Sequence, residues 1–256
     1  MERGKRVANQ FLEVRQKKVE RQDLISIAAL LVSAAAFFVS FIRGKRERDQ
    51  TLRLQLDDAL AHIMSLAVDN AKLLHDEGAK DPEYYQNISQ ALNQQMAALV
   101  QQAIFLTRQI PNLVTSQHYQ TIGFGSTAIG DSHTAGEFFH KAADLAPTGF
   151  YTVMALRTYA FYLFQQRRFE EGRAQYQLTF RELPGSDTVC RYTNGMTYQV
   201  WAFNELNLAN NPGEAAACME KARAEFNGID VASIKENALR AIAPIEAQIA
   251  AARRST

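Results

Sequence analysis

Apolar residues recur at helical spacing through most of the chain. From Asp49 to Leu74 they stand three and four positions apart, which places them on one face of a helix. Asp81 followed by Pro82 indicates a new helix, because an aspartate side chain caps a first turn and proline is tolerated at its first position. A second apolar stripe runs from about Glu83 to Gln109. The pattern predicts an all-α fold with a helical hairpin over 43–110.

The stretch from Ser116 to Gly149 shows the same spacing in two halves. Residues 117–128 and 135–145 each carry small and apolar side chains on one face, with Asp131 between them. Pro147 ends the second half because it disfavours helical geometry in the preceding residue. The residues that define the stretch are Tyr119, Ile122, Gly123, Ala135, Phe139, Ala142 and Pro147. We predict a second helical hairpin here.

Two later segments, from Val153 to Pro184 and from Met196 to Phe226, have similar spacing, and the second matches least well. Together with the first stretch they resemble tetratricopeptide (TPR) repeats, at about 116–149, 153–186 and 196–229. The resemblance covers residues 111–226 of the chain. It implies helical hairpins stacked as a short right-handed α-solenoid, with a C-terminal capping helix and tail over 227–256.

In TPR proteins the first helix of each hairpin lines a concave groove that binds a protein segment. The matching positions here are Gln120, Phe124, Met154, Arg157, Phe161, Phe164, Asn204 and Asn207. Aromatic and arginine side chains often anchor interfaces, so such a groove suits an apolar or helical partner segment. The Lys/Asn/Arg clamp with which one TPR subclass holds a terminal carboxylate is absent. The alternative, that some of these aromatic residues pack between repeats, stays open.

The segment from Leu24 to Ile42 contains 19 residues without a charge. At ~1.5 Å per residue it spans ~28 Å, close to the ~30 Å hydrocarbon core of a bilayer. We expect a single-pass transmembrane helix in contact with the lipid bilayer, after a basic arm over 1–23; a cleaved signal peptide and a buried helix are the alternatives. The Lys and Arg residues directly after Ile42 favour a cytoplasmic body. The seven Lys and Arg of the arm favour the opposite orientation.

Composition and charge narrow the classes of partner. The 256 residues are 47% hydrophobic, which is enough for a sizeable core. The formal charge is +5 over residues 1–49 and −4 over residues 50–256, and a mildly acidic body argues against nucleic-acid binding. Cys190 and Cys218 are too few for a disulfide framework, so we expect free buried thiols.

Motifs for catalysis, metal ions or cofactors are not found in the sequence. The five histidines form no spaced ligand pattern, and the glycines at 123 and 125 lack the Gly-Lys-Ser/Thr sequence of a phosphate loop. We therefore expect no enzymatic activity and no cofactor. The expected function is a membrane-anchored scaffold or adaptor that binds a protein partner. The alternatives are a small-molecule or signal sensor coupled to the membrane helix, and a homo-oligomer formed through the membrane and juxtamembrane helices.

Overall fold

The computed structural model describes residues 2–78 and 80–255, with side chains for residues 37–78 and 80–254. Over these residues the secondary structure is helical, which confirms the predicted all-α class. The chain divides into two compact units, Met1–Leu54 and Gln55–Thr256. The candidate site lies entirely in the second unit.

Nine α-helices and one 3-10 helix follow one another in the described residues. They are α1 (Glu2–Glu77), α2 (Pro82–Gln109), η1 (Pro111–Leu113), α3 (Ser116–Ala128), α4 (Ser132–Leu145), α5 (Phe150–Gln165), α6 (Phe169–Glu182), α7 (Thr188–Asn207), α8 (Pro212–Asn227) and α9 (Ala232–Ser255). The predicted start of α2 is confirmed, because the Asp81 carboxylate accepts a hydrogen bond from the Tyr84 amide at 3.0 Å.

The predicted membrane location is contradicted by the described part of the chain. None of its helices combines the length and the apolar character that crossing a bilayer requires. Residues 1–36, which include the basic arm and most of the predicted span, lie outside the residues whose side chains are described. The described remainder of that span, 37–42, covers only about 9 Å at ~1.5 Å per residue, and Arg43 follows it. The expected single-pass location with a cytoplasmic body is therefore wrong for the described residues, whereas the expected lipid contact of Leu24 to Ile42 falls mostly outside them.

In the second unit, α3 packs against the C-terminal part of α1 and against α2. The buried α1 residues stand three and four positions apart and are Leu56, Ala59, Leu60 and Ile63. A Cβ on Gly125 would lie 2.7 Å from Val100 Cγ2 of α2 and 2.9 Å from Ile63 Cγ2 of α1. The three helices thus meet where α3 has no side chain. His118 Nε2 of α3 also lies 3.1 Å from Asp57 Oδ1 of α1.

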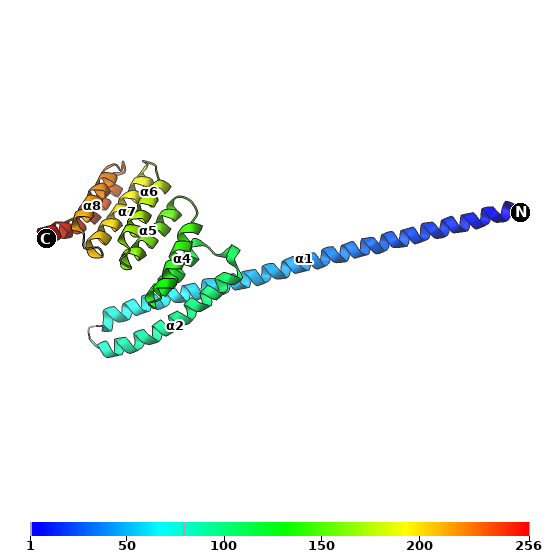
Figure 1. Ribbon diagram of the computed structural model, residues 1–256, viewed down its shortest axis with the longest axis horizontal. Helices are drawn as coiled ribbons and strands as arrows, with labels where there is room; N and C mark the ends of the chain where they lie inside the picture. The colour runs from blue at the N-terminus through cyan, green and yellow to red at the C-terminus, as the bar shows by residue number, and fades with distance from the viewer. Residues whose placement is uncertain (1, 79, 256) are drawn as a thin grey trace. The chain divides into compact units, whose positions relative to one another are not determined.

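Three helical hairpins follow, α3 with α4, α5 with α6, and α7 with α8 (Figure 1). In each hairpin a phenylalanine ring lies directly on a glycine of the other helix. The pairs are Gly123 with Phe139, Gly172 with Phe164 and Gly195 with Phe226, and a Cβ on these glycines would lie 2.8, 2.5 and 2.3 Å from the ring. Those distances leave no room for a methyl group, so the glycines determine how closely the paired helices approach.

A buried ion pair joins the second and third hairpins. The two carboxylate oxygens of Glu205, on α7, accept hydrogen bonds from Arg173 Nε and Nη2 of α6, both at 2.7 Å. Trp201 Nε1 donates to the same carboxylate at 2.9 Å, and Glu205 has no exposed surface. Hydrogen bonding to Glu205 raises the pKa of Arg173. Because an unpaired buried carboxylate is costly, this pair holds α6 against α7.

Tyr176 of α6 makes a second buried contact with α7. Its hydroxyl accepts a hydrogen bond from Asn204 Nδ2 at 2.6 Å, and its ring stacks on Trp201 with centroids 5.4 Å apart. Burial raises the pKa of the Tyr176 phenol above the ordinary value of 10.0. The neutral phenol is therefore the form that the folded protein stabilises.

Replacing Phe139 by alanine should lower the free energy of unfolding by about 3–5 kcal/mol. The ring is 2% exposed and contacts Gly123 and the rings of Phe124 and Tyr162. Denaturant unfolding followed by circular dichroism measures the loss. The control is Phe105→Ala on α2, where the side chain is 59% exposed and the loss should stay within about 0.5 kcal/mol. Equal losses in the two variants would show that Phe139 is not a core residue.

Stability should fall as the pH rises above about 10, because the folded-state pKa of Tyr176 exceeds the unfolded value of 10.0. The stabilisation is complete below that pH, and it is lost above it as the unfolded chain releases the proton first. In Tyr176→Phe this titration is removed, so between about pH 9 and pH 11 its stability should fall by about 1.4 kcal/mol less in total than that of the wild type. Denaturant midpoints between about pH 9 and pH 11 test the difference. Identical slopes would contradict the assignment.

Candidate binding groove

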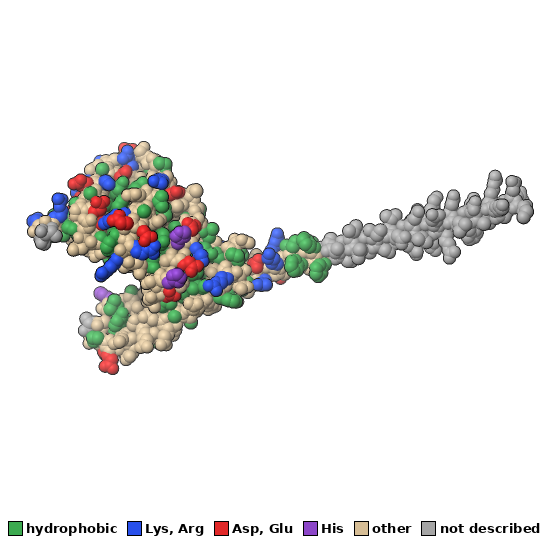
Figure 2. Space-filling view, viewed as in Figure 1, with side chains coloured by type: hydrophobic (Ala, Val, Ile, Leu, Met, Phe, Trp, Pro, Cys, Tyr) green, Lys and Arg blue, Asp and Glu red, His purple; other side chains and the backbone are tan. Residues whose placement is uncertain are grey.

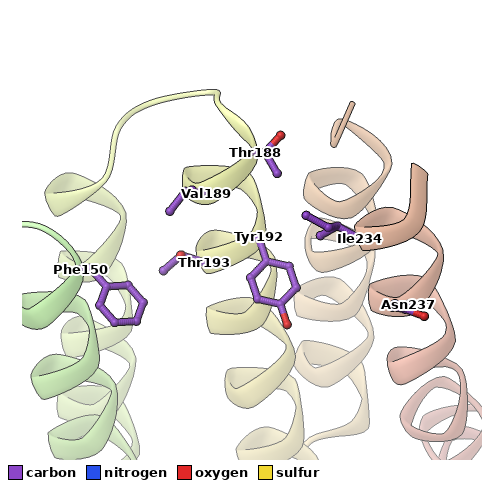
Figure 3. A pocket seen from close by; sticks show the side chains of 7 residues that line it. All are labelled: Phe150, Thr188, Val189, Tyr192, Thr193, Ile234 and Asn237. Carbon is purple, nitrogen blue, oxygen red and sulfur yellow. The ribbon is translucent and has the colours of Figure 1, made fainter. Parts of the chain in front are cut away.

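The first helices of the three hairpins and α9 line two adjoining pockets. The first, of about 420 Å³, lies between α5, α7 and α9 (Figure 3) and is lined by Phe150, Thr188, Val189, Tyr192, Thr193, Ile234 and Asn237. The second, of about 430 Å³, lies between α3 and α5 and is lined by Thr115, Ser116, Gln117, Gln120, Pro147, Phe150, Tyr151 and Met154. Phe150 lines both pockets. We call the two together the binding groove.

Local sequence explains why apolar side chains lie in the first turns of α5 and α7. Gly149 precedes α5 with φ of 81°, a backbone conformation that favours glycine, and α5 then begins at Phe150. Asp187 caps α7 by accepting hydrogen bonds from the amides of Val189 and Cys190 at 2.8 and 2.9 Å. These bonds, the one from Cys190 first, lower the pKa of Asp187. Val189 is thereby held in the first turn of α7.

Figure 3 shows how the first pocket is formed. Phe150 on α5 and the side chains of Val189 and Thr193 on α7 point into the space between these helices. On the other side Ile234 of α9 points toward Tyr192 of α7. Apolar side chains from three helices therefore line this open pocket.

The groove is apolar, exposed and uncharged. Phe150, Tyr151 and Val189 are 49%, 66% and 64% exposed, and the residues that line the two pockets include no Asp, Glu, Lys or Arg. Exposed apolar surface rimmed by polar groups is typical of binding sites. By contrast, on the face shown in Figure 2 the Lys and Arg side chains of the second unit are interspersed with Asp and Glu. That face carries no positive patch of the kind that binds nucleic acid.

Five of the predicted groove residues lie in or beside the groove, or continue the helix faces that line it. Gln120 and Met154 line the second pocket. Arg157 follows Met154 by one turn and is half-buried. Phe124 is exposed on α3, and Phe161 is half-buried one turn beyond Arg157.

The other three predicted residues do not line it. Phe164 is fully buried in its own hairpin. Asn204 is also fully buried, and its side-chain amide donates a hydrogen bond to the Tyr176 hydroxyl. Asn207 is exposed at the end of α7, where its amide donates to the Phe203 carbonyl at 2.9 Å. On α7 the exposed side chain is Phe203, at 44%, and not its neighbour Asn204.

The residues that sequence reasoning missed are Phe150, Tyr151, Val189, Tyr192 and Ile234. We predicted that the helices of the second and third repeats begin near Val153 and Met196, whereas α5 and α7 begin at Phe150 and Thr188. The sequence does contain two residues that indicate the true helix starts. Gly149 precedes one true start, and Asp187 is a standard capping residue for the other.

The described residues offer little of what a metal-binding site or a reactive cysteine requires. Among them no three His, Cys, Asp or Glu side chains form a group that could hold a metal ion. Cys190 and Cys218 are free and buried. Burial raises the pKa of the Cys218 thiol to about 12 and also raises the pKa of Cys190. Neither thiol is therefore activated as a nucleophile at neutral pH.

Comparison with known proteins places the chain in no family. No family model matches it, and no curated protein matches it. One solved structure, described as the crystal structure of BtubC (BKLC) from P. vanneervenii, is similar with 16% sequence identity and a TM-score of 0.39. The similarity covers 78% of this chain and 90% of that one. At this score the likeness supports no inference about fold or function, so the resemblance to TPR proteins stays a prediction.

An apolar dye should detect the groove. Phe150→Ser removes the ring shared by both pockets, and serine suits the first turn of a helix. We expect bis-ANS to bind the variant about fivefold more weakly, equivalent to ~1 kcal/mol of lost apolar contact. Fluorescence titration measures the change. Leu178→Ser on α6, where the side chain is exposed outside both pockets, is the control. If both substitutions lower the affinity for the dye equally, the groove is not the site at which the dye binds.

Proposed function

We propose that the three hairpins form a TPR-like α-solenoid and that the protein is a scaffold or adaptor that holds a segment of a protein partner. The binding groove is the surface that we assign to this role. The observation that supports it most directly is the pair of adjoining pockets, which meet at Phe150 and have no charged lining residue. Aromatic side chains at the centre of an apolar surface are typical anchors of protein interfaces.

The polar groups of the groove suit a peptide chain. Gln117 and Gln120 on α3 and Asn237 on α9 present amides at its two ends, and Thr188 presents a hydroxyl. Amides and hydroxyls can pair with the backbone groups of a bound segment, while the apolar pockets receive its side chains. Without lining Lys or Arg, the groove does not favour a phosphate backbone.

The sensor function, the alternative suggested by the sequence, would be favoured by an enclosed polar pocket. The two pockets of the groove are instead open and mainly apolar. An open apolar groove suits a segment that runs across several helices better than a small polar metabolite. The scaffold or adaptor function is therefore the one we propose.

Site-specific photo-crosslinking tests this proposal. A benzophenone amino acid at Tyr151 should crosslink the full chain to a discrete partner protein in the cells that express it, because this side chain is 66% exposed at the groove. The same amino acid at Leu178 should not capture that protein. Adding Val189→Asp to the Tyr151 probe should abolish capture, since it places a charge in the first pocket. Capture of the same protein from Leu178, or capture that survives Val189→Asp, would contradict the proposal.

A further inference from the structure

Arg157 differs from the other half-buried arginines of the hairpins. Arg173 and Arg191, with side chains 21% and 32% exposed, pair with Glu205 and Glu225. In the described part of the chain no carboxylate pairs with Arg157. Its Nη1 contacts Met154 Sδ at 3.8 Å, and its buried Nε has no hydrogen-bond partner. The guanidinium is therefore partly withdrawn from water without a compensating anion.

This arrangement is unfavourable for the protein by itself. Burial lowers the pKa of Arg157 from the ordinary 12.5, and the phenol of Tyr176 is the titratable group near enough to act on it in the opposite direction. The guanidinium nevertheless stays charged at neutral pH, because arginine is not deprotonated in proteins under ordinary conditions. A half-buried cation gains most from an anion that arrives with its own apolar surroundings, since water is then excluded from the pair.

The position of Arg157 tells us where such an anion must come from. Phe150, Met154 and Arg157 stand on one face of α5, at successive turns. Met154 lines the second pocket and contacts the guanidinium. The cation therefore lies at the edge of a groove whose lining is otherwise uncharged. A segment that fills the groove with apolar side chains would bring its next side chain toward Arg157.

We infer that the segment held in the groove is apolar and carries an internal Asp or Glu side chain that pairs with Arg157. This inference rests on the proposed function, and it defines the chemistry of the partner. The apolar side chains would occupy the two pockets that share Phe150. The carboxylate would supply the counter-ion that the described side chains do not provide.

Selection from a display library of random peptides on the full-length protein tests the inference. Enriched peptides should combine apolar residues with an Asp or Glu, and an enriched peptide should bind Arg157→Gln about tenfold more weakly. Changing its acidic residue to the amide should weaken binding to the wild type by a similar factor but hardly affect binding to Arg157→Gln. Arg181→Gln, at an exposed arginine of α6, is the matched control and should leave affinity unchanged.

Combining the change in the protein with the change in the peptide also covers the case in which Arg157→Gln loosens α5. A damaged groove would lower the affinity of the acidic peptide and of its amide form by the same factor, whereas loss of the ion pair lowers only that of the acidic peptide. Independent losses for the two changes, or enriched peptides without an acidic residue, would overturn the inference. Phe150→Ser separates this failure from that of the proposed function. Peptides that need Phe150 but not Arg157 contradict only the acidic contact. Peptides that bind without Phe150 contradict the groove itself and, with it, the inference.

Discussion

Close contact between a phenylalanine ring and a glycine is the constraint on which each hairpin of this protein depends. The three contacts, Gly123–Phe139, Gly172–Phe164 and Gly195–Phe226, join the two helices of α3/α4, α5/α6 and α7/α8. In two hairpins the glycine lies on the first helix, and in the middle one it lies on the second. The close approach of the paired helices therefore does not depend on which of the two carries the glycine. Since interiors are packed to the density of organic crystals, a side chain at any of these glycines would force the paired helices apart.

Polar contacts then determine how neighbouring hairpins are registered. Arg173 reaches across to the buried carboxylate of Glu205, and Asn204 reaches back to the hydroxyl of Tyr176. Hydrogen bonds need defined distances and angles, whereas apolar contact tolerates sliding, so such pairs can select one arrangement of α6 on α7. The Tyr162 hydroxyl makes a comparable link to the Ser132 carbonyl between the first two hairpins. The groove is a consequence of this registration, because its walls belong to different hairpins.

Much of the fold follows from sequence, because helical spacing and capping residues act locally. The all-α class, the α3/α4 hairpin and the start of α2 at Asp81-Pro82 were predicted for that reason. The exposed face of α7 was missed by one residue, because the side of a helix that is buried depends on its packing against other helices. The part that α9 plays in the groove was missed as well, because it results from packing between distant segments. The predicted membrane location is contradicted by the described residues, which include the side chains of only 37–42 of the uncharged run, followed by Arg43.

The central claim is that the first turns of α3, α5 and α7, together with α9, form the surface that recognises a partner. Amide chemical shifts of the isotopically labelled full chain, recorded while a peptide selected on it is added, test this claim directly. The account predicts that the changes concentrate around Gln120, Phe150, Tyr192 and Ile234, which belong to four helices and line the groove. Changes confined to α4, α6 and α8, or to α2, would contradict it.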